Sequence, residues 1–260
     1  MANSEKSHYV GRHAGKDELR DQIWTALKES GDAIDNPFGG ISNFVGADIA
    51  ATSLAEMPLW KLAKVVKCNP DAPQSHARLR ALQDGKILYM AVPRLAEEKC
   101  FIELTSEDLI GRGIALEDAS QWQTAVKIGK RVSFEEMKPI DLAVTGCVAV
   151  TRAGGRTGKG AGFADLEFAM LRQFKLLSPE TPIVTTVHSL MVVDNDRLPL
   201  QPHDTFLNWI ITPEEIIEVK DVGTQPGGID WDRILPDQYE SIPVLRKLKP
   251  GWTSKNNLHS

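Results

Sequence analysis

The sequence predicts an α/β protein in three layers, in which helices cover both faces of a mainly parallel sheet. Two apolar runs support this prediction: residues 140–150 read IDLAVTGCVAV, and residues 181–188 read TPIVTTVH. Nearly continuous apolar character along a strand is typical of a parallel sheet that is buried on both faces. Helical patterns separate these runs along the chain, and alternation of strands with helices indicates the same fold class.

The first element in chain order is an amphipathic helix that begins near Lys16. Leu19, Ile23 and Leu27 recur at every fourth residue of KDELRDQIWTALKES, so they share one face of a helix. Lys16 and Arg20 lie together on its polar face, one helical turn apart.

The remaining elements follow from the same two periodicities. We expect helices at 56–66, at 77–86, where a glycine supplies the C-terminal stop, and at 164–177. We expect strands, or pieces next to strands, at 62–67, 86–93 and 209–213.

Composition and charge narrow the class of protein. The chain has 260 residues, of which 42% are hydrophobic and 25% charged, and its formal net charge of −5 argues against a general nucleic-acid-binding protein. Its three cysteines form no CxxC pair, so a reduced, cytoplasmic compartment fits best, and Cys147 reads as a core thiol rather than a nucleophile. Neither a signal peptide nor a membrane-spanning run is recognisable. We expect no nucleic-acid or membrane partner, and a monomer or a homodimer.

Three segments are expected along the chain: a flexible N-terminus at 1–15, one α/β domain at 16–222, and an extension at 223–260. The extension contains several prolines and glycines with scattered tryptophan, isoleucine and leucine, which is too apolar for a disordered linker. We expect it to pack on the domain or on a partner.

A glycine-rich loop is the strongest functional signal in the chain. Residues 152–169 read RAGGRTGKGAGFADLEFA and follow the strand expected at 140–150. A strand, a glycine loop and a helix start together direct backbone N–H groups and the positive helix end at one point, which favours an anion such as phosphate. Arg156 offers a planar fork and Lys159 a mobile charge, while Asp165 beside phosphates suggests a magnesium ion.

Two common phosphate-binding loops do not fit the spacing of these glycines. The Walker A loop needs a hydroxyl residue where this chain has Gly160. The dinucleotide fingerprint needs GxGxxG, whereas Gly158, Gly160 and Gly162 are spaced as GxGxG. The glycines are also compatible with a tight turn from strand to helix that binds nothing.

The loop has a close counterpart in a known family. The stretch from Arg156 to Asp165 resembles the RxGxGxGYYD signature of the 5-formyltetrahydrofolate cyclo-ligase family. KDELR is similar to a K-x-x-x-R helix of that family, and the segment with His203 and Asp204 is similar to its HD motif. The runs DELRDQIW, ISNF, GKGAGFADLEFAML and IPVLRKL resemble one branch, the methenyltetrahydrofolate synthase domain-containing proteins, so that the resemblance covers most of residues 16–249.

The resemblance implies a NagB/RpiA-like fold and an ATP- and magnesium-dependent ligase that converts 5-formyltetrahydrofolate to 5,10-methenyltetrahydrofolate, with release of ADP and phosphate. It implies that Mg²⁺ is bound by Asp165 and Asp204. It places ATP, the co-substrate, against Lys16, Arg20, Arg156, Gly158, Lys159, Gly160, Ala161, Gly162 and Phe163. It assigns catalytic roles to Arg156 and Lys159, and contacts with the folate to Asp71, Gly160 and Phe163.

The sequence departs from the family pattern on the folate side. Phe163 and Ala164 stand where the signature has tyrosines, and Asp71 stands where classical members have a glutamate that contacts folate. Two alternatives therefore stay open: an ATP-binding enzyme of the same fold with a non-folate substrate, and a non-catalytic folate- or nucleotide-binding relative.

Overall fold

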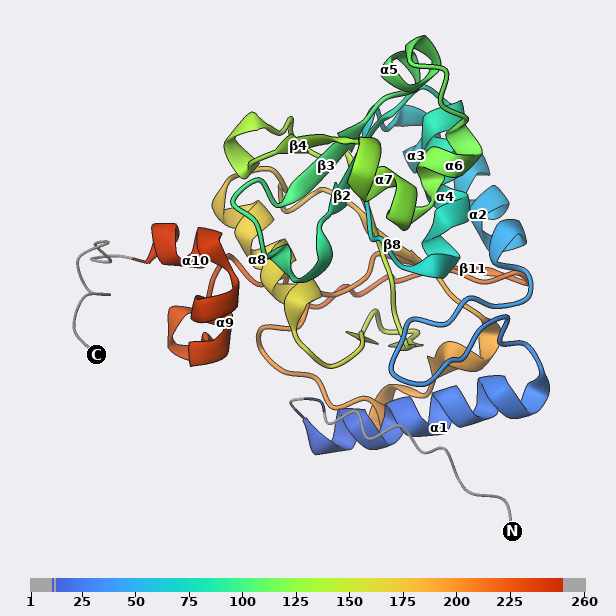
Figure 1. Cartoon of the computed structure of the whole chain (residues 1–260). Helices are drawn as coiled ribbons and strands as arrows, with labels where there is room; N and C mark the ends of the chain where they lie inside the picture. Colours follow the sequence, from blue (N-terminus) through green and yellow to red (C-terminus); the bar gives the residue numbers. More distant parts are fainter. Residues whose placement is uncertain (1–10, 12, 250–260) are drawn as a thin grey trace.

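The computed structural model describes residue 11 and residues 13–249, and within them an eight-stranded central sheet lies between helices (Figure 1). In sheet order its strands are β11 (Ile216–Glu218), β10 (Trp209–Ile211), β8 (Ile183–Thr186), β5 (Leu142–Thr145), β1 (Val65–Cys68), β2 (Ile87–Ala91), β3 (Phe101–Leu104) and β4 (Lys130–Val132). Neighbours from β10 to β2 are parallel, whereas β11, β3 and β4 run antiparallel to a neighbour. The predicted α/β fold with a mainly parallel sheet is confirmed.

Helices cover both faces of the central sheet. The α-helices in the described part of the chain are α1 (Ala14–Ser30), α2 (Ala47–Glu56), α3 (Pro58–Leu62), α4 (Ser75–Gln83), α5 (Ser106–Gly111), α6 (Leu116–Ser120), α7 (Trp122–Ile128), α8 (Phe163–Gln173), α9 (Pro236–Ser241) and α10 (Pro243–Leu248). Short 3₁₀ helices are η1 (Ala72–Gln74), η2 (Pro93–Leu95), η3 (Phe134–Glu136), η4 (Ser189–Met191), η5 (Asn195–Arg197) and η6 (Trp231–Arg233). Helices α2, α4 and α7 contact strands of the sheet on one side, and α8 lies on the other (Figure 1). No described helix has both the length and the apolar character that a membrane span requires.

A second, three-stranded sheet positions the glycine loop. In sheet order its strands are β7 (Arg156–Thr157), β6 (Ala149–Thr151) and β9 (Val192–Val193). The strand expected at 140–150 is therefore two strands, β5 and β6, that belong to different sheets. The chain leaves β5 at Gly146, where a Cβ atom would lie 2.5 Å from Asp71 Oδ2 and 2.9 Å from Gln74 Oε1, so a larger residue would displace these two side chains.

Several boundaries differ from the sequence-based expectations. Helix α1 begins at Ala14, inside the segment expected to be flexible, most of which lies outside the described residues. The helix expected at 56–66 is the five-residue α3, because the chain extends into β1 by Val65. Helix α8 ends at Gln173 rather than at 177. Helix α2, strands β3 and β4, and helices α5 to α7 were not anticipated at all.

A buried ion pair joins α8 to the central sheet. Lys67 on β1 places its Nζ 2.6 Å from Oε1 of Glu167 on α8, and the two side chains are 0% and 6% exposed. Lys67 Nζ also donates a hydrogen bond to Asn69 Oδ1 and lies 4.7 Å from the centroid of the Phe168 ring. Burial raises the pKa of Glu167, and the charge of Lys67 opposes this shift. Because an unpaired buried charge is costly, each partner of this pair requires the other.

Candidate active site

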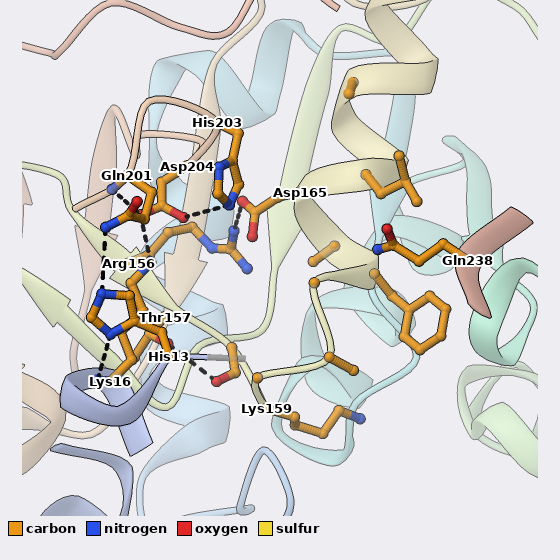
Figure 2. Close-up of a pocket in the computed structure, with 18 of the residues that line it drawn as sticks. His13, Lys16, Arg156, Thr157, Lys159, Asp165, Gln201, His203, Asp204 and Gln238 are labelled. Carbon is orange, nitrogen blue, oxygen red and sulfur yellow. Dashed lines mark hydrogen bonds and ion pairs between the residues drawn. The ribbon is translucent and has the colours of Figure 1, made fainter. Parts of the chain in front are cut away.

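The glycine loop, helix α1 and residues 228–238 enclose a pocket with a volume of about 500 Å³. Side chains from α1, β7, α8 and the loop at 201–204 gather around it (Figure 2). All of the site residues proposed from the sequence line this pocket: Lys16, Arg20, Asp71, Arg156, Gly158, Lys159, Gly160, Ala161, Gly162, Phe163, Asp165 and Asp204. The fold thus brings together segments as far apart in sequence as Lys16 and Asp204.

The glycine loop connects β7 to the start of α8 through left-handed backbone conformations. Gly160 has φ 105° and Gly162 has φ 75°, values that residues with a Cβ atom rarely adopt. Gly162 is the N-cap of α8 and provides no side chain to accept from the first N–H groups of the helix. The positive end of an 11-residue helix therefore faces the pocket, which is a geometry suited to an anion.

Arg156 lies beneath this helix end and is almost fully buried, at 2% exposure. One terminal nitrogen, Nη1, donates to Asp165 Oδ1 at 2.5 Å, whereas Nε and Nη2 have no hydrogen-bond partner among the described residues. Burial is the largest single effect and opposes the charged form, but the Asp165 carboxylate, the Cys147 side chain and the Asp204 carboxylate together outweigh it and keep the pKa of Arg156 above its ordinary value. A ligand with several acceptor oxygens could form hydrogen bonds with the two unpaired nitrogens of Arg156 and would thereby stabilise its buried charge.

Helix α1 brings two further cations to the loop. Lys16 Nζ lies 2.5 Å from Asp204 Oδ2, and Arg20 donates from Nε to Gly158 O at 2.6 Å and from Nη2 to Thr157 Oγ1 at 2.7 Å. The sequence indicated a polar helix face for these residues, but they are 7% and 3% exposed. Arg20 thus holds the backbone of the glycine loop in place from helix α1.

The charges that line the pocket are nearly balanced. Five cationic side chains (Lys and Arg) and four carboxylates line it, and each of these five cations is in an ion pair with a carboxylate. Lys159 Nζ, for example, lies 2.8 Å from Asp71 Oδ1. Lys159, which is expected to contact phosphate, is thus paired with Asp71, which is expected to contact folate. A polyphosphate with its full negative charge would therefore be poorly neutralised by the protein alone, and an accompanying cation would improve the balance.

The two aspartates expected to hold magnesium lie next to each other in the fold. Asp165 Oδ1 accepts from the backbone N–H of Thr205 at 3.1 Å, so Asp165 is adjacent to the residue that follows Asp204. Among the described residues, no group of three or more His, Cys, Asp or Glu side chains is arranged to hold a metal ion. One or two carboxylates completed by phosphate oxygens and water are nevertheless what Mg²⁺ usually takes in nucleotide sites, so the pair fits an ion that arrives with its ligand.

The pocket also contains polar residues that sequence reasoning missed: His13, Asn69, Gln201, Arg233 and Gln238. His13 is the N-cap of α1, where its Nδ1 accepts from the N–H of Lys16 at 3.4 Å (Figure 2). Its Nε2 lies 3.4 Å from Gln201 Nε2, and the backbone N–H of Gln201 donates to Asp204 Oδ2 at 2.7 Å. These contacts fix the carboxylate of Asp204, and a histidine just ahead of a helix was the only sequence signal for them.

Cysteine chemistry is not expected in this protein, and the prediction is easily checked. Cys68, Cys100 and Cys147 are free and buried, and burial raises the pKa of Cys68 to about 11 and that of Cys100 to about 12. An aromatic disulfide reagent at pH 7 should therefore label no thiol rapidly in the folded chain and three thiols per chain in denaturant. Rapid labelling of one thiol in the folded chain would contradict the burial of these side chains.

Comparison with known proteins places this pocket in a family context. The model of the 5-formyltetrahydrofolate cyclo-ligase family matches residues 12–213, which include all the site residues proposed from the sequence. Over 242 residues the chain is 35% identical to a methenyltetrahydrofolate synthase domain-containing protein of Bos taurus, covering 90% of this chain and 62% of that protein. The Homo sapiens protein of the same name is 33% identical, with 90% and 61% covered. The chain thus spans about three fifths of the length of these relatives.

A solved structure shows the same fold. The NMR structure of 5,10-methenyltetrahydrofolate synthetase from Aquifex aeolicus matches with a TM-score of 0.51 at 17% sequence identity, covering 84% of this chain and 99% of that one. At this level of identity the likeness concerns the fold, and the chemistry of the site has to be argued from the residues themselves.

Proposed function

The chain belongs to the 5-formyltetrahydrofolate cyclo-ligase family, and from this premise we propose that it converts 5-formyltetrahydrofolate to 5,10-methenyltetrahydrofolate with consumption of ATP and in the presence of magnesium. One observation carries the proposal. The buried Arg156 guanidinium has two nitrogens without a hydrogen-bond partner among the described residues, at the start of α8. Phosphate oxygens are the acceptors that both a guanidinium fork and a helix start favour.

The proposed reaction has two stages. The formyl oxygen attacks the γ-phosphorus of ATP, the bond from that phosphorus to the bridging oxygen of ADP breaks, and an imidate phosphate forms at N5. The N10 amine then adds to the activated carbon and loses its proton, and phosphate leaves as the ring closes. An amide carbonyl is a weak electrophile with a poor leaving group, so the phosphorylation makes the carbon reactive.

The protein's part in such a transfer is mainly positioning and charge stabilisation. Arg156 and Lys159 would contact the transferred phosphoryl group, and the N–H groups of 158–162 would bind the adjacent phosphates. Lys16 and Arg20 would approach the nucleotide from α1. A magnesium ion bound by Asp165, Asp204 and phosphate oxygens would neutralise part of the triphosphate charge. For Lys159 to reach a phosphate, it has to exchange its contact with Asp71. The Lys159 side chain is 48% exposed and can move, but the exchange leaves the Asp71 carboxylate, which is 8% exposed, without its cation.

A second candidate is an ATP-dependent enzyme of the same fold that acts on a non-folate substrate. The folate side of the pocket favours it, because Asp71 is occupied by Lys159 and Ala164 offers neither a phenol nor an aromatic surface. The two candidates share the phosphate end of the site and differ in what accepts the phosphoryl group.

The test uses the purified full chain with MgATP and 5-formyltetrahydrofolate. We expect the absorbance of the methenyl product to appear together with an equal amount of ADP, and excess EDTA to abolish both. ATP binding without product would favour the second candidate, and folate binding without turnover would favour a non-catalytic relative. If the chain binds neither ATP nor 5-formyltetrahydrofolate, the proposal is overturned.

A further inference from the structure

One wall of the pocket comes from residues beyond those that the family model matches. The family match ends at 213, yet residues 228–238 line the pocket. This segment contains η6 and leads into α9 and α10, which lie beside α8 (Figure 1). The residues that follow it pack into the protein, since Ile242 and Leu245 are both 0% exposed. The segment thus lines the pocket next to a packed part of the chain, and the family signature does not explain its residues.

Arg233 is the one cation that this segment contributes among the described pocket residues. Its Nη1 lies 3.4 Å from His203 Nδ1, and its Nε lies 3.0 Å from Asp230 Oδ2. His203 precedes Asp204, which binds Lys16. Arg233 therefore stands at the end of the pocket that holds the candidate metal and phosphate residues, rather than at the Asp71 end.

The ion pair of Arg233 differs in burial from the other pairs at this end. Lys16 and Arg156 bind carboxylates at 2.5 Å with side chains that are 9% and 1% exposed. The Arg233 and Asp230 side chains are 48% and 46% exposed, and exposed pairs contribute little to stability. Arg233 can therefore exchange Asp230 for a ligand oxygen at small cost, and in a pocket of nearly balanced charge it is the cation most easily released.

We propose that Arg233 binds the terminal phosphates of the nucleoside triphosphate, with Asp230 as the carboxylate that it exchanges for them. This inference rests on the proposed function, because it assumes a triphosphate in the pocket. It assigns to the extension a direct role in nucleotide binding, whereas the family match contains none of these residues. It also predicts opposite effects for the two members of one ion pair.

The experiment measures the affinity of the full chain for MgATP by isothermal titration calorimetry. Arg233→Gln should weaken MgATP binding about three- to tenfold, as expected for one exposed charged contact. Asp230→Asn should instead strengthen it about two- to fivefold, because the competing carboxylate is gone. The gain should disappear in the double variant, because Asp230 acts through Arg233. If the pair only holds η6 in shape, both single variants should weaken binding alike.

Two controls separate this contact from general charge effects. Lys247→Ala on α10 removes the same charge from elsewhere in the 223–260 extension, where Lys247 pairs with Glu98 at the surface, and it should leave the affinity unchanged. AMP has no terminal phosphates, so Arg233→Gln should not alter any AMP binding. Circular dichroism melting of each variant verifies that the chain is folded.

The outcomes distinguish the inference from its premise. If the wild-type chain binds no MgATP, the proposed function fails and the inference fails with it. If the wild-type chain binds MgATP and Arg233→Gln binds it equally well, or if Asp230→Asn weakens binding as Arg233→Gln does, the inference alone is overturned.

Discussion

Replacing Arg156 with alanine is expected to lower the rate of methenyl product formation by about a hundredfold to a thousandfold. Removal of one preorganised donor that faces developing charge has an effect of this size in other enzymes. We expect the largest loss of rate at Arg156. Two of its nitrogens are buried without a hydrogen-bond partner among the described residues, and they lie next to the helix start that faces the pocket. Steady-state kinetics with MgATP and 5-formyltetrahydrofolate measure the change.

Two further variants make the Arg156 result interpretable. Arg156→Lys retains a charge near Asp165 but loses the planar fork, so we expect a loss of tenfold or more. Arg152→Ala removes an arginine from the turn of the same β6–β7 hairpin, where it pairs with Glu215 and is 58% exposed, and it should keep full activity. Full activity of a folded Arg156→Ala protein would remove the glycine loop from the mechanism.

Replacing Lys67 with methionine is expected to lower the free energy of unfolding by about 3–5 kcal/mol. The substitution leaves Glu167 in the protein interior without its cationic partner, and the side chain of Glu167 is 6% exposed. Glu167→Gln should also destabilise the protein, because it leaves the Lys67 ammonium buried at 0% exposure. Urea unfolding followed by circular dichroism measures both changes.

The buried pair is tested further by a double variant and a surface pair. Lys67→Met combined with Glu167→Met removes both charges, so it should be less destabilising than the two single effects added together. Lys61→Met breaks a pair with Glu56 in which both side chains are more than half exposed, and it should produce no measurable change. Additive effects of the Lys67 and Glu167 substitutions would mean that the two charges do not interact.

Strands and helices could be predicted where the apolar runs are long. They could not be predicted where small residues or a bend in the chain determine the structure. The run at 181–188 gave β8, but the run at 140–150 concealed a change of sheet at Gly146, because close approach to Asp71 and Gln74 leaves no trace in hydrophobic periodicity. Four of the ten residues of helix α2 are alanine, which packs well but contributes little to an apolar pattern. The division at 222, the compartment and the oligomeric state stay predictions.

The sequence predicted that the motif residues meet in one pocket, but it did not predict how they pair, and their roles stay predictions. The motif residues all line one pocket, because a signature implies which residues meet. It does not imply that Arg156 is buried against Asp165 or that Lys159 binds Asp71, since both contacts depend on how separate elements pack. Arg233 was missed for a related reason. Its segment has irregular structure with neither helical nor strand periodicity, and only the folded chain shows that it reaches His203.

The most direct test of the account is a crystal structure of the full chain with magnesium and a non-hydrolysable ATP analogue. We predict that the β- and γ-phosphates lie against the N–H groups of 158–162, with a phosphate oxygen within hydrogen-bond distance of Arg156 Nε or Nη2. A triphosphate seated elsewhere, with Arg156 left as it is against Asp165, would contradict the account.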